Sequence, residues 1–284
     1  MSIFKYIVIP DVHGRDFWRD VVSEYLASDV KFIFLGDYLD PYEYEEIDNE
    51  YKGLLDIIEY KKNYPDRFVL LLGNHDLHYL TREGRGSRWD YFHAERNAKT
   101  FLDNINLFQM TYSAEINGKK FLFSHAGILP GWLYKNCEKF KMEVPDEITY
   151  CNELITDWTQ IPDFNIMLYS EDLRENLFKA AGDVSYHRGG GSQFGSIVWA
   201  DYHEHLRKED RIPGIIQVFG HTQQEKDPIN IDNEAYCLDC RRAFGIDSDG
   251  NITELNGAEI PLFDVDAELD AEKKRIEKLM AFFL

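Results

Sequence analysis

Basic residues are scarce in this sequence. The chain has 31 Lys and Arg residues against 51 Asp and Glu residues, which gives a formal net charge of -20 at pH 7. Binding to nucleic acid without sequence preference depends on cationic neutralisation of phosphates, and anionic membrane surfaces attract basic segments. The charge balance therefore predicts that neither nucleic acid nor a membrane surface is a partner of this protein.

Cysteines and long apolar runs are also few. The four cysteines form no convincing disulfide framework, and the zinc-knuckle spacing of Cys237 and Cys240 lacks a second pair, so we expect buried free thiols. No apolar stretch is long enough to span a bilayer, and the N-terminal residues show no charged leader before an apolar stretch and a cleavage site. These features favour a cytoplasmic location.

Residues that build a core are, by contrast, plentiful. Hydrophobic residues make up 44% of the 284 residues and aromatic residues 14%, a composition that argues against disorder. The length allows one large α/β domain or two small ones.

Five short apolar runs each end abruptly in a polar cluster that contains Asp, Asn or His. Runs of this length that are bounded by turn residues indicate buried strands. Ligand-type residues beyond the carboxyl ends of several strands are typical of an α/β active site. In chain order the clusters are Asp11-Val-His13-Gly14, Gly36-Asp37-Tyr-Leu-Asp40, Gly73-Asn74-His75-Asp76, Ser124-His125-Ala-Gly127 and Gly220-His221-Thr222.

Strands and helices alternate along the first third of the chain, which implies βαβ units with right-handed crossovers. Two further strands are expected on either side of Asn117-Gly118, a strong hairpin signal. The predicted strands are Tyr6–Ile9, Lys31–Leu35, Arg67–Leu72, Leu107–Ala114 and Lys119–Phe123, and the predicted helices lie near Asp16–Leu26, Glu46–Lys62 and Trp89–Leu102.

The pattern changes to helical, acidic and aromatic-rich at about residues 130–183. No linker composition flanks this segment, so we expect a helical insertion over the core of a single domain spanning residues 1–264. Residues 265–284 have the pattern of an amphipathic C-terminal helix, which would dock on the core or form a dimer contact. Strand character returns at Ile197–Trp199, Ile215–Phe219, Ala235–Leu238 and Ala243–Ile246, and a turn at Asp249-Gly250 precedes a last short strand.

The five clusters contain the donors of a metal centre. Asp11 and His13 are two residues apart at a strand end, so their side chains point to the same side and can chelate one ion. Asp37 closes the neighbouring strand, and its carboxylate can bridge two ions. Mixed carboxylate, amide and imidazole donors suit Mn²⁺, Fe or Zn²⁺ rather than Ca²⁺. Two such ions about 3.5–4 Å apart can clamp an in-line phosphoryl displacement and generate hydroxide at neutral pH.

The order and the residue sequences of the clusters resemble those of the calcineurin-like metallophosphoesterase superfamily, and within it the phosphoprotein phosphatase (PPP)-like branch and its bacterial relatives. The resemblance runs from Asp11 to about Phe244. It implies a four-layer α/β/β/α sandwich. It also implies that His75 protonates or stabilises the leaving oxygen and that Asp40 orients His75. The implied ligands are Asp11, His13 and Asp37 for one metal, and Asp37, Asn74, His125 and His221 for the other.

Details of the sequence bear on the branch and on the substrate. Gln223 stands where many metallophosphoesterases have a second His, and PPP-like enzymes also lack that His. The run of Arg188 and three glycines resembles the Arg-Gly-Gly segment of bacterial PPP-like proteins, which makes Arg188 the candidate phosphate ligand. Asp40 is followed by Pro41-Tyr42, where PPP enzymes have Arg-Gly with a phosphate-binding Arg. Asp76 replaces Glu and Ala126 replaces Gly, which are milder departures. The phosphate could instead be bound by Arg82, Arg85 or Arg88, although the simpler expectation is that these are charged surface residues.

The leading hypothesis is thus a two-metal phosphomonoesterase whose substrate is a phosphoprotein, in the form of phosphoserine or phosphothreonine, or a small phosphate ester. A symmetrical bis(5'-nucleosyl)-tetraphosphatase or another nucleotide phosphohydrolase is the alternative. A nuclease or phosphodiesterase is disfavoured by the charge, and an inactive metal-binding scaffold by the intact motifs. The remaining polar residues of note, expected to be structural or solvated, are His78, His93, His203, His205 and the acidic run at 43–50.

Overall fold

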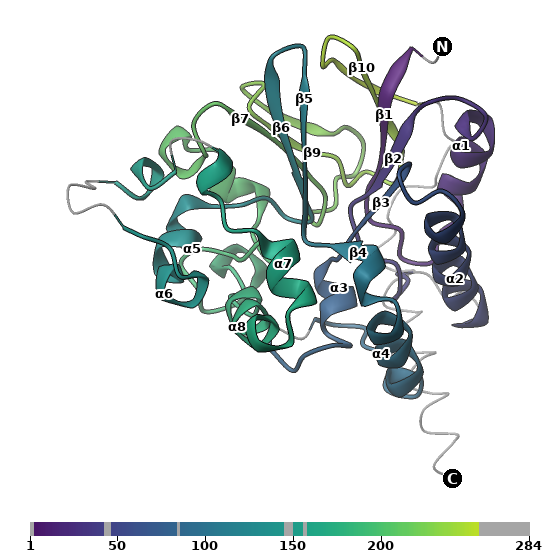
Figure 1. Cartoon of the computed structure of the whole chain (residues 1–284), viewed down its shortest axis with the longest axis horizontal. Coiled ribbons are helices and arrows are strands. Elements are labelled where there is room, and N and C mark those ends of the chain that lie inside the picture. The colour runs from purple at the N-terminus through teal and green to yellow at the C-terminus, as the bar shows by residue number, and fades with distance from the viewer. Residues whose placement is uncertain (1–2, 43–46, 84–85, 145–149, 156–157, 256–284) are drawn as a thin grey trace.

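The computed structural model describes residues 3–42, 47–83, 86–144, 150–155 and 158–255. Two β-sheets lie face to face, with helices on the outer side of each (Figure 1). The predicted α/β/β/α architecture is therefore confirmed. None of the helices in these ranges is long and apolar enough to cross a membrane.

The first sheet has six strands in the order β11-β10-β1-β2-β3-β4. Neighbouring strands from β1 to β4 are parallel, as the βαβ alternation predicts, and β10 runs antiparallel to β1. The strands are β1 (Phe4–Ile9), β2 (Lys31–Phe34), β3 (Phe68–Leu71), β4 (Phe108–Gln109), β10 (Phe244–Asp247) and β11 (Ile252–Glu254).

The second sheet has five strands in the order β5-β6-β7-β9-β8. The hairpin predicted at Asn117-Gly118 joins β5 to β6, and β6, β7 and β9 are parallel. The strands are β5 (Thr111–Ile116), β6 (Lys119–Ser124), β7 (Ile215–Phe219), β8 (Ile229–Ile231) and β9 (Ala235–Cys237).

Helices α1 and α2 cover the first sheet, and α5 to α8 lie beside the second sheet (Figure 1). The α-helices are α1 (Phe17–Tyr25), α2 (Ile47–Asn63), α3 (Asn74–Leu77), α4 (Ala94–Asp103), α5 (Pro130–Lys135), α6 (Cys137–Phe140), α7 (Phe164–Tyr169) and α8 (Glu171–Ala181). The 3-10 helices are Ile105–Leu107, Cys151–Glu153, Trp158–Gln160, Tyr186–Arg188, Tyr202–His205 and Lys208–Asp210.

Apolar residues of the central strands are buried on both faces of the first sheet. Along β2, Phe32 and Phe34 join the core beneath the helices, which also includes Trp18. The alternate residues Ile33 and Leu35 join the core between the two sheets. Burial on both faces explains why these strands are continuous apolar runs rather than alternating ones, and it fixes the strand ends where the polar clusters begin.

Three sequence predictions about secondary structure are wrong in detail. Residues 197–199 form a buried turn rather than a strand, because the backbone N–H groups of Trp199 and Ala200 both bond the Ser196 carbonyl. The strand expected at Leu107–Ala114 is divided between the sheets at Met110, whose N–H donates to the Asn165 side chain. Helix α4 begins at Ala94, later than expected, because the Asp90 carboxylate bonds the two backbone N–H groups before it.

The domain boundaries stay predictions. Residues 265–284 lie outside the described residues. The described part of residues 130–183 is helical, as the sequence indicates, but its standing as an insertion over the core is untested. All four cysteines are free thiols, and Cys237 and Cys240 are buried whereas Cys137 and Cys151 are partly exposed.

Candidate metal centre

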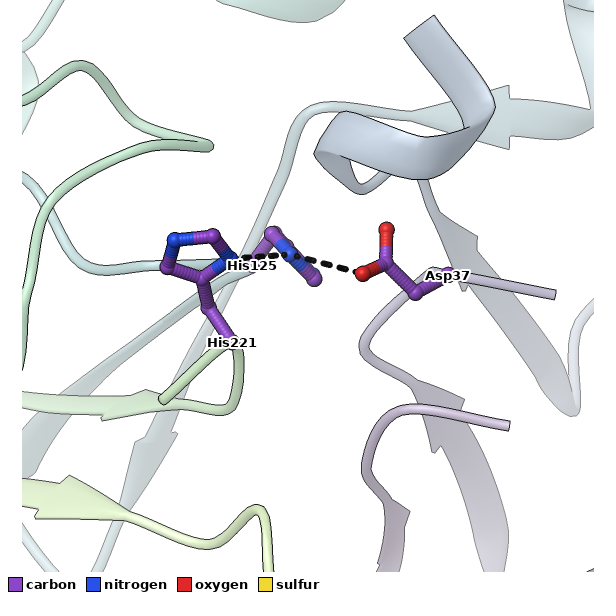
Figure 2. A group of neighbouring side chains, drawn as sticks. All are labelled: Asp37, His125 and His221. Atoms are coloured by element: carbon purple, nitrogen blue, oxygen red, sulfur yellow. Dashed lines mark hydrogen bonds and ion pairs between the residues drawn. The ribbon is translucent and has the colours of Figure 1, made fainter. Parts of the chain in front are cut away.

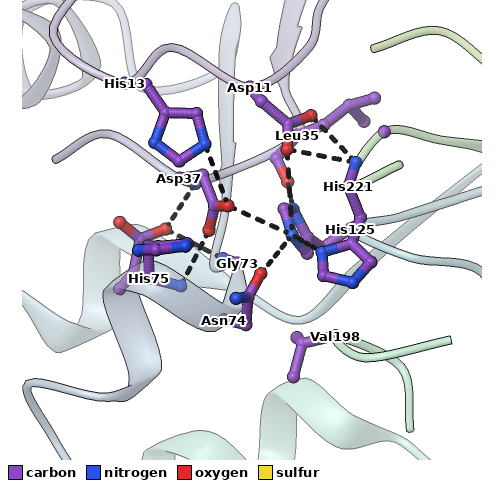
Figure 3. A network of polar contacts seen from close by, with 12 residues as sticks. Asp11, His13, Leu35, Asp37, Gly73, Asn74, His75, His125, Val198 and His221 are labelled. Atoms are coloured by element: carbon purple, nitrogen blue, oxygen red, sulfur yellow. Dashed lines mark hydrogen bonds and ion pairs between the residues drawn. The ribbon is translucent and has the colours of Figure 1, made fainter. Parts of the chain in front are cut away.

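Six predicted ligand residues meet between the two sheets (Figure 3). Each follows the carboxyl end of a strand, and all six are buried. Because the parallel strands end at the same edge, their terminal side chains share one space. The residues are Asp11 and His13 after β1, Asp37 after β2, Asn74 after β3, His125 after β6 and His221 after β7.

Asp37 lies between the two groups of donors. Its Oδ2 atom is 3.4 Å from Nε2 of His13 and 3.5 Å from Nε2 of His125. One group of mutually close donor atoms is Asp11, His13 and Asp37, and another is Asp37, His125 and His221, which Figure 2 shows. The carboxylate of Asp37 is thus common to both groups.

The second group contains donor atoms that face one another. His125 Nε2 is 3.0 Å from Oδ1 of Asn74 and 3.2 Å from Nδ1 of His221. Nε2 of His221 is buried and has no hydrogen-bond partner within the described residues. Buried polar atoms normally have partners, so a cation that accepts these lone pairs fits the arrangement.

Hydrogen bonds outside the centre fix the orientation of two imidazoles. Nδ1 of His13 lies 2.9 Å from the Leu39 carbonyl oxygen, and Nδ1 of His125 lies 2.9 Å from that of Leu35. A carbonyl only accepts, so Nδ1 carries the proton and the Nε2 lone pair points into the centre. Metal-bound histidines are held in this way by backbone carbonyls.

The ionisable side chains of the centre are buried, and bound cations would stabilise them. Burial raises the pKa of Asp11 well above its usual value, and nearby Asp239 adds to the effect. Burial likewise raises the pKa of Asp37 and lowers the pKa values of His13 and His221 well below their usual range. Two divalent ions would stabilise the ionised carboxylates and the neutral imidazoles together. The residues present therefore fit a two-metal centre.

Two glycines leave room for the carboxylates. A Cβ on Gly73 would overlap Oδ1 of Asp37, and a Cβ on Gly220 would overlap Oδ2 of Asp11. Both glycines stand immediately before a predicted ligand. Any larger side chain at either position would displace a carboxylate from the centre.

Strained loops present the ligands and are held by Asp76. His13, Asp37, Asp40 and His221 have left-handed backbone conformations, with φ between +45° and +65°. Such residues cost about 1–3 kcal/mol each and persist where the surroundings hold them. The Asp76 carboxylate accepts from the backbone N–H groups of residues 37, 38 and 73 at 2.7–3.0 Å, so the Asp that replaces the expected Glu joins two ligand loops.

His75 and Asp40 form the predicted pair beside this centre. Nδ1 of His75 lies 2.9 Å from Oδ2 of Asp40, so Nε2 is at the edge of the ring that faces away from Asp40. The same Oδ2 lies 2.7 Å from Nε2 of His78, and the Tyr79 hydroxyl donates to Oδ1. Although burial opposes it, hydrogen bonds from His75 and His78 lower the pKa of Asp40 below its usual range. Burial lowers the pKa of His75 to about 4.

The arginines differ from expectation in one respect. Arg188 lies near the centre, with its Nη1 atom 3.7 Å from Oδ2 of Asp201, and its guanidinium is partly exposed. Arg82 is exposed, as expected of surface charge, and Arg85 lies outside the described residues. Arg88 is not surface charge, because its Nη2 atom is 3.3 Å from Nε2 of His75.

The sequence pattern does not predict the contacts of three other buried residues. Glu50 is not solvated, since its carboxylate accepts from the backbone N–H of Asp40 at 2.9 Å. His78 directly follows α3 and stands three residues after His75, a spacing that could have indicated their shared face. Asp239 follows β9, which makes β9 the sixth strand that ends in a buried polar residue, and its Oδ1 has no hydrogen-bond partner within the described residues.

The other histidines are structural or exposed, as predicted. Nδ1 of His93 pairs with Asp90 at 2.7 Å, and Nδ1 of His203 pairs with Asp201 at 2.6 Å. His205 is buried and its ring packs on Phe219.

Comparisons with known proteins bear on the family of the chain. The model of the calcineurin-like phosphoesterase family matches residues 4–225. The chain is 27% identical over 165 residues to the serine/threonine-protein phosphatase 4 catalytic subunit of Eremothecium gossypii, covering 55% of this chain and 50% of that protein. It is 29% identical over 155 residues to the Kluyveromyces lactis protein of the same name, covering 52% and 47%. The chain thus spans about half the length of these curated relatives.

A solved structure shares the fold at low identity. It is a protein serine/threonine phosphatase from Saccharomyces cerevisiae, described as similar to human phosphatase PP5. The TM-score is 0.50 at 15% identity, with 91% of this chain and 82% of that chain covered.

Proposed function

The chain belongs to the calcineurin-like phosphoesterase family, and from that premise we propose that it is a phosphatase that hydrolyses phosphomonoesters with two bound metal ions. The observation that carries the proposal is the position of Asp37, whose carboxylate lies 3.4–3.5 Å from imidazoles of both donor groups. In phosphatases of the two-metal kind, such a pair of ions stabilises the attacking and leaving oxygens of the displacement.

The two donor groups suggest how the ions would be held. Asp11, His13 and Asp37 would hold one ion, and Asp37 would share the other with Asn74, His125 and His221. When bound, the ions would polarise the phosphoryl oxygens and activate water. The donors are those that Mn²⁺, Fe and Zn²⁺ accept, so reconstitution with each metal is the way to identify the native pair.

His75 and Asp40 would handle the proton of the leaving group. Asp40 stays ionised because His75 hydrogen bonds it and His78 lies 2.7 Å from it, and it holds the Nδ1 proton of His75. Nε2 is then the atom that would pass a proton to the leaving oxygen. The low pKa of His75 means that Nε2 is unprotonated at neutral pH, but a phosphate dianion nearby favours the charged imidazole.

Arg188 would bind the phosphate on the His125 and His221 side. Its Nη1 atom lies 3.7 Å from Oδ2 of Asp201, and that carboxylate also accepts from the hydroxyl of Thr222, the residue after His221. The guanidinium is therefore close to the loop that carries His221. Its partial exposure leaves it able to reach a substrate oxygen, which Arg binds bidentately.

We propose a phosphoserine or phosphothreonine protein as one substrate, which the names of the curated relatives support. The test is hydrolysis of p-nitrophenyl phosphate, a phosphothreonine peptide and diadenosine tetraphosphate by the Mn²⁺-loaded protein. We expect turnover of the first two, and a preference for the third would favour the tetraphosphatase alternative. Loaded protein that hydrolyses none of them would contradict the proposal and favour the inactive scaffold.

A further inference from the structure

Arg88 touches the proposed catalytic pair. Its Nη2 atom is 3.3 Å from Nε2 of His75, the ring edge from which a proton would leave. Its Nε atom donates to the backbone carbonyl of Asp40 at 3.3 Å. The guanidinium therefore lies beside the atom that the leaving oxygen of a bound phosphate ester would have to approach.

The side chain of Tyr42 supports this guanidinium. The Cζ atom of Arg88 lies 3.6 Å from the centroid of the Tyr42 ring. The same ring packs edge-on against the predicted ligand His13, with 4.9 Å between centroids. Arginine stacked on an aromatic face keeps its fork of N–H donors in a fixed plane, so Tyr42 connects the orientation of Arg88 to that of the metal centre.

The backbone around Arg88 is built for a defined position. Arg88 has a φ of +58°, a left-handed conformation that it shares with four residues of the centre. A side chain on Gly86 would lie 3.4 Å from both His75 and Trp199, so this stretch of backbone closely approaches the site. Strain of this kind is found where the fold holds a functional group in place.

Arg188 lies by a different part of the centre. Its Nη1 atom is 3.7 Å from Oδ2 of Asp201, which also accepts from the hydroxyl of Thr222, the residue after His221. Arg88 instead contacts His75 directly and His13 through the Tyr42 ring. The two guanidiniums are thus associated with different predicted ligands.

We propose that Arg88, stacked on Tyr42, binds the phosphate group of the substrate together with Arg188 and thereby takes part in catalysis. The inference rests on the proposed phosphatase function. A phosphate dianion is a stronger acceptor for the guanidinium than a neutral imidazole is, so substrate binding would draw the Arg88 donor away from His75. Nε2 of His75 would then be free to face the leaving oxygen.

The test compares Arg88→Ala with Arg82→Ala in the full Mn²⁺-loaded protein. Arg82 is an exposed arginine close to Arg88 in sequence, so its substitution makes the same charge change at an exposed position. Three quantities are measured for each variant: kcat/KM for p-nitrophenyl phosphate, the affinity for inorganic phosphate by calorimetry, and the Mn²⁺ content by elemental analysis.

We expect Arg88→Ala to lower kcat/KM about 10²-fold, because one charged donor to the transition state is lost. Phosphate affinity should fall at least about tenfold, while Mn²⁺ content stays that of the unaltered protein. Guanidinium ion added to Arg88→Ala should restore part of the activity. Arg88→Lys keeps the charge but loses the forked N–H donors, so it should bind phosphate more weakly than the unaltered protein. Arg82→Ala should match the unaltered protein in all three quantities.

Equal phosphate affinity in Arg88→Ala and Arg82→Ala would overturn the inference, and so would a loss of phosphate affinity that only follows a loss of Mn²⁺. Unaltered protein that hydrolyses no phosphomonoester would count against the proposed function instead. The phosphate affinities would still decide the role of Arg88 in that case, because calorimetry requires no turnover.

Discussion

Replacement of His75 by Asn isolates the proton transfer at the candidate site. The Asn amide can still donate to Asp40 in place of Nδ1, and Asp40 keeps its contacts with His78 at 2.7 Å and with Tyr79. The buried carboxylate therefore stays satisfied and the metal ligands are untouched. What the variant removes is Nε2, the atom that faces the substrate.

The expected loss depends on the leaving group. General acid catalysis contributes about 10²–10⁴-fold, which corresponds to roughly 3–5 kcal/mol of transition-state stabilisation. Phenolate leaves poorly without a proton, so kcat for phenyl phosphate should fall by that full amount in His75→Asn. The nitrophenolate of p-nitrophenyl phosphate leaves readily without one, so its loss should be about tenfold or less.

Steady-state kinetics with both substrates and a metal analysis of each protein test this reasoning. Losses of equal size for the two substrates would refute the assignment of His75 as the acid. They would indicate that His75 stabilises charge on the phosphate or holds the loop.

The remaining predictions concern the ligand loops. Asp76→Ala leaves three buried N–H groups without their acceptor, so chemical denaturation should show a free energy of unfolding lower by at least about 3 kcal/mol; a change below about 1 kcal/mol would contradict this. Gly220→Ala should displace Asp11 and lower Mn²⁺ content with little loss of helix signal in circular dichroism, whereas full metal occupancy would show that the loop adapts. Burial raises the pKa values of Asp11 and Asp37, so in the metal-free folded state these two carboxyls keep protons that the unfolded chain releases, and their contribution to stability should fall as pH rises above about 4. The increase in Tm on adding Mn²⁺ should consequently be larger at about pH 8 than at about pH 5, and a pH-independent increase would argue against carboxylate ligation.

The sequence predicts the strand-end ligands well because their positions follow from local rules. A parallel strand that is buried on both faces is an uninterrupted apolar run, so its end is visible where the first Asp or Asn appears. Asp11, Asp37 and Asn74 are examples. Since parallel strands end at one edge, the convergence of these residues follows from topology without knowledge of side-chain contacts.

Contacts made by loops could not be predicted in the same way. Arg88 reaches His75 through a loop conformation with positive φ, and no residue pattern signals it. Glu50 lies in an acidic run whose composition predicts exposure to solvent. Its carboxylate nevertheless accepts from the backbone N–H of Asp40, because α2 brings it there. The apolar segment at 197–199 has strand-like composition, but the packing of Gly195 against Ala200 makes it turn.

The metal stoichiometry of the unaltered protein tests the two-metal centre most directly. After removal of metal and reconstitution with excess Mn²⁺, elemental analysis of the dialysed protein should give about two ions per chain. Asp37→Asn, which alters the carboxylate shared by both donor groups, should give fewer than about one, and Asn74→Ala should keep about one. A ratio of one or less in the unaltered protein, or two in Asp37→Asn, would contradict the account.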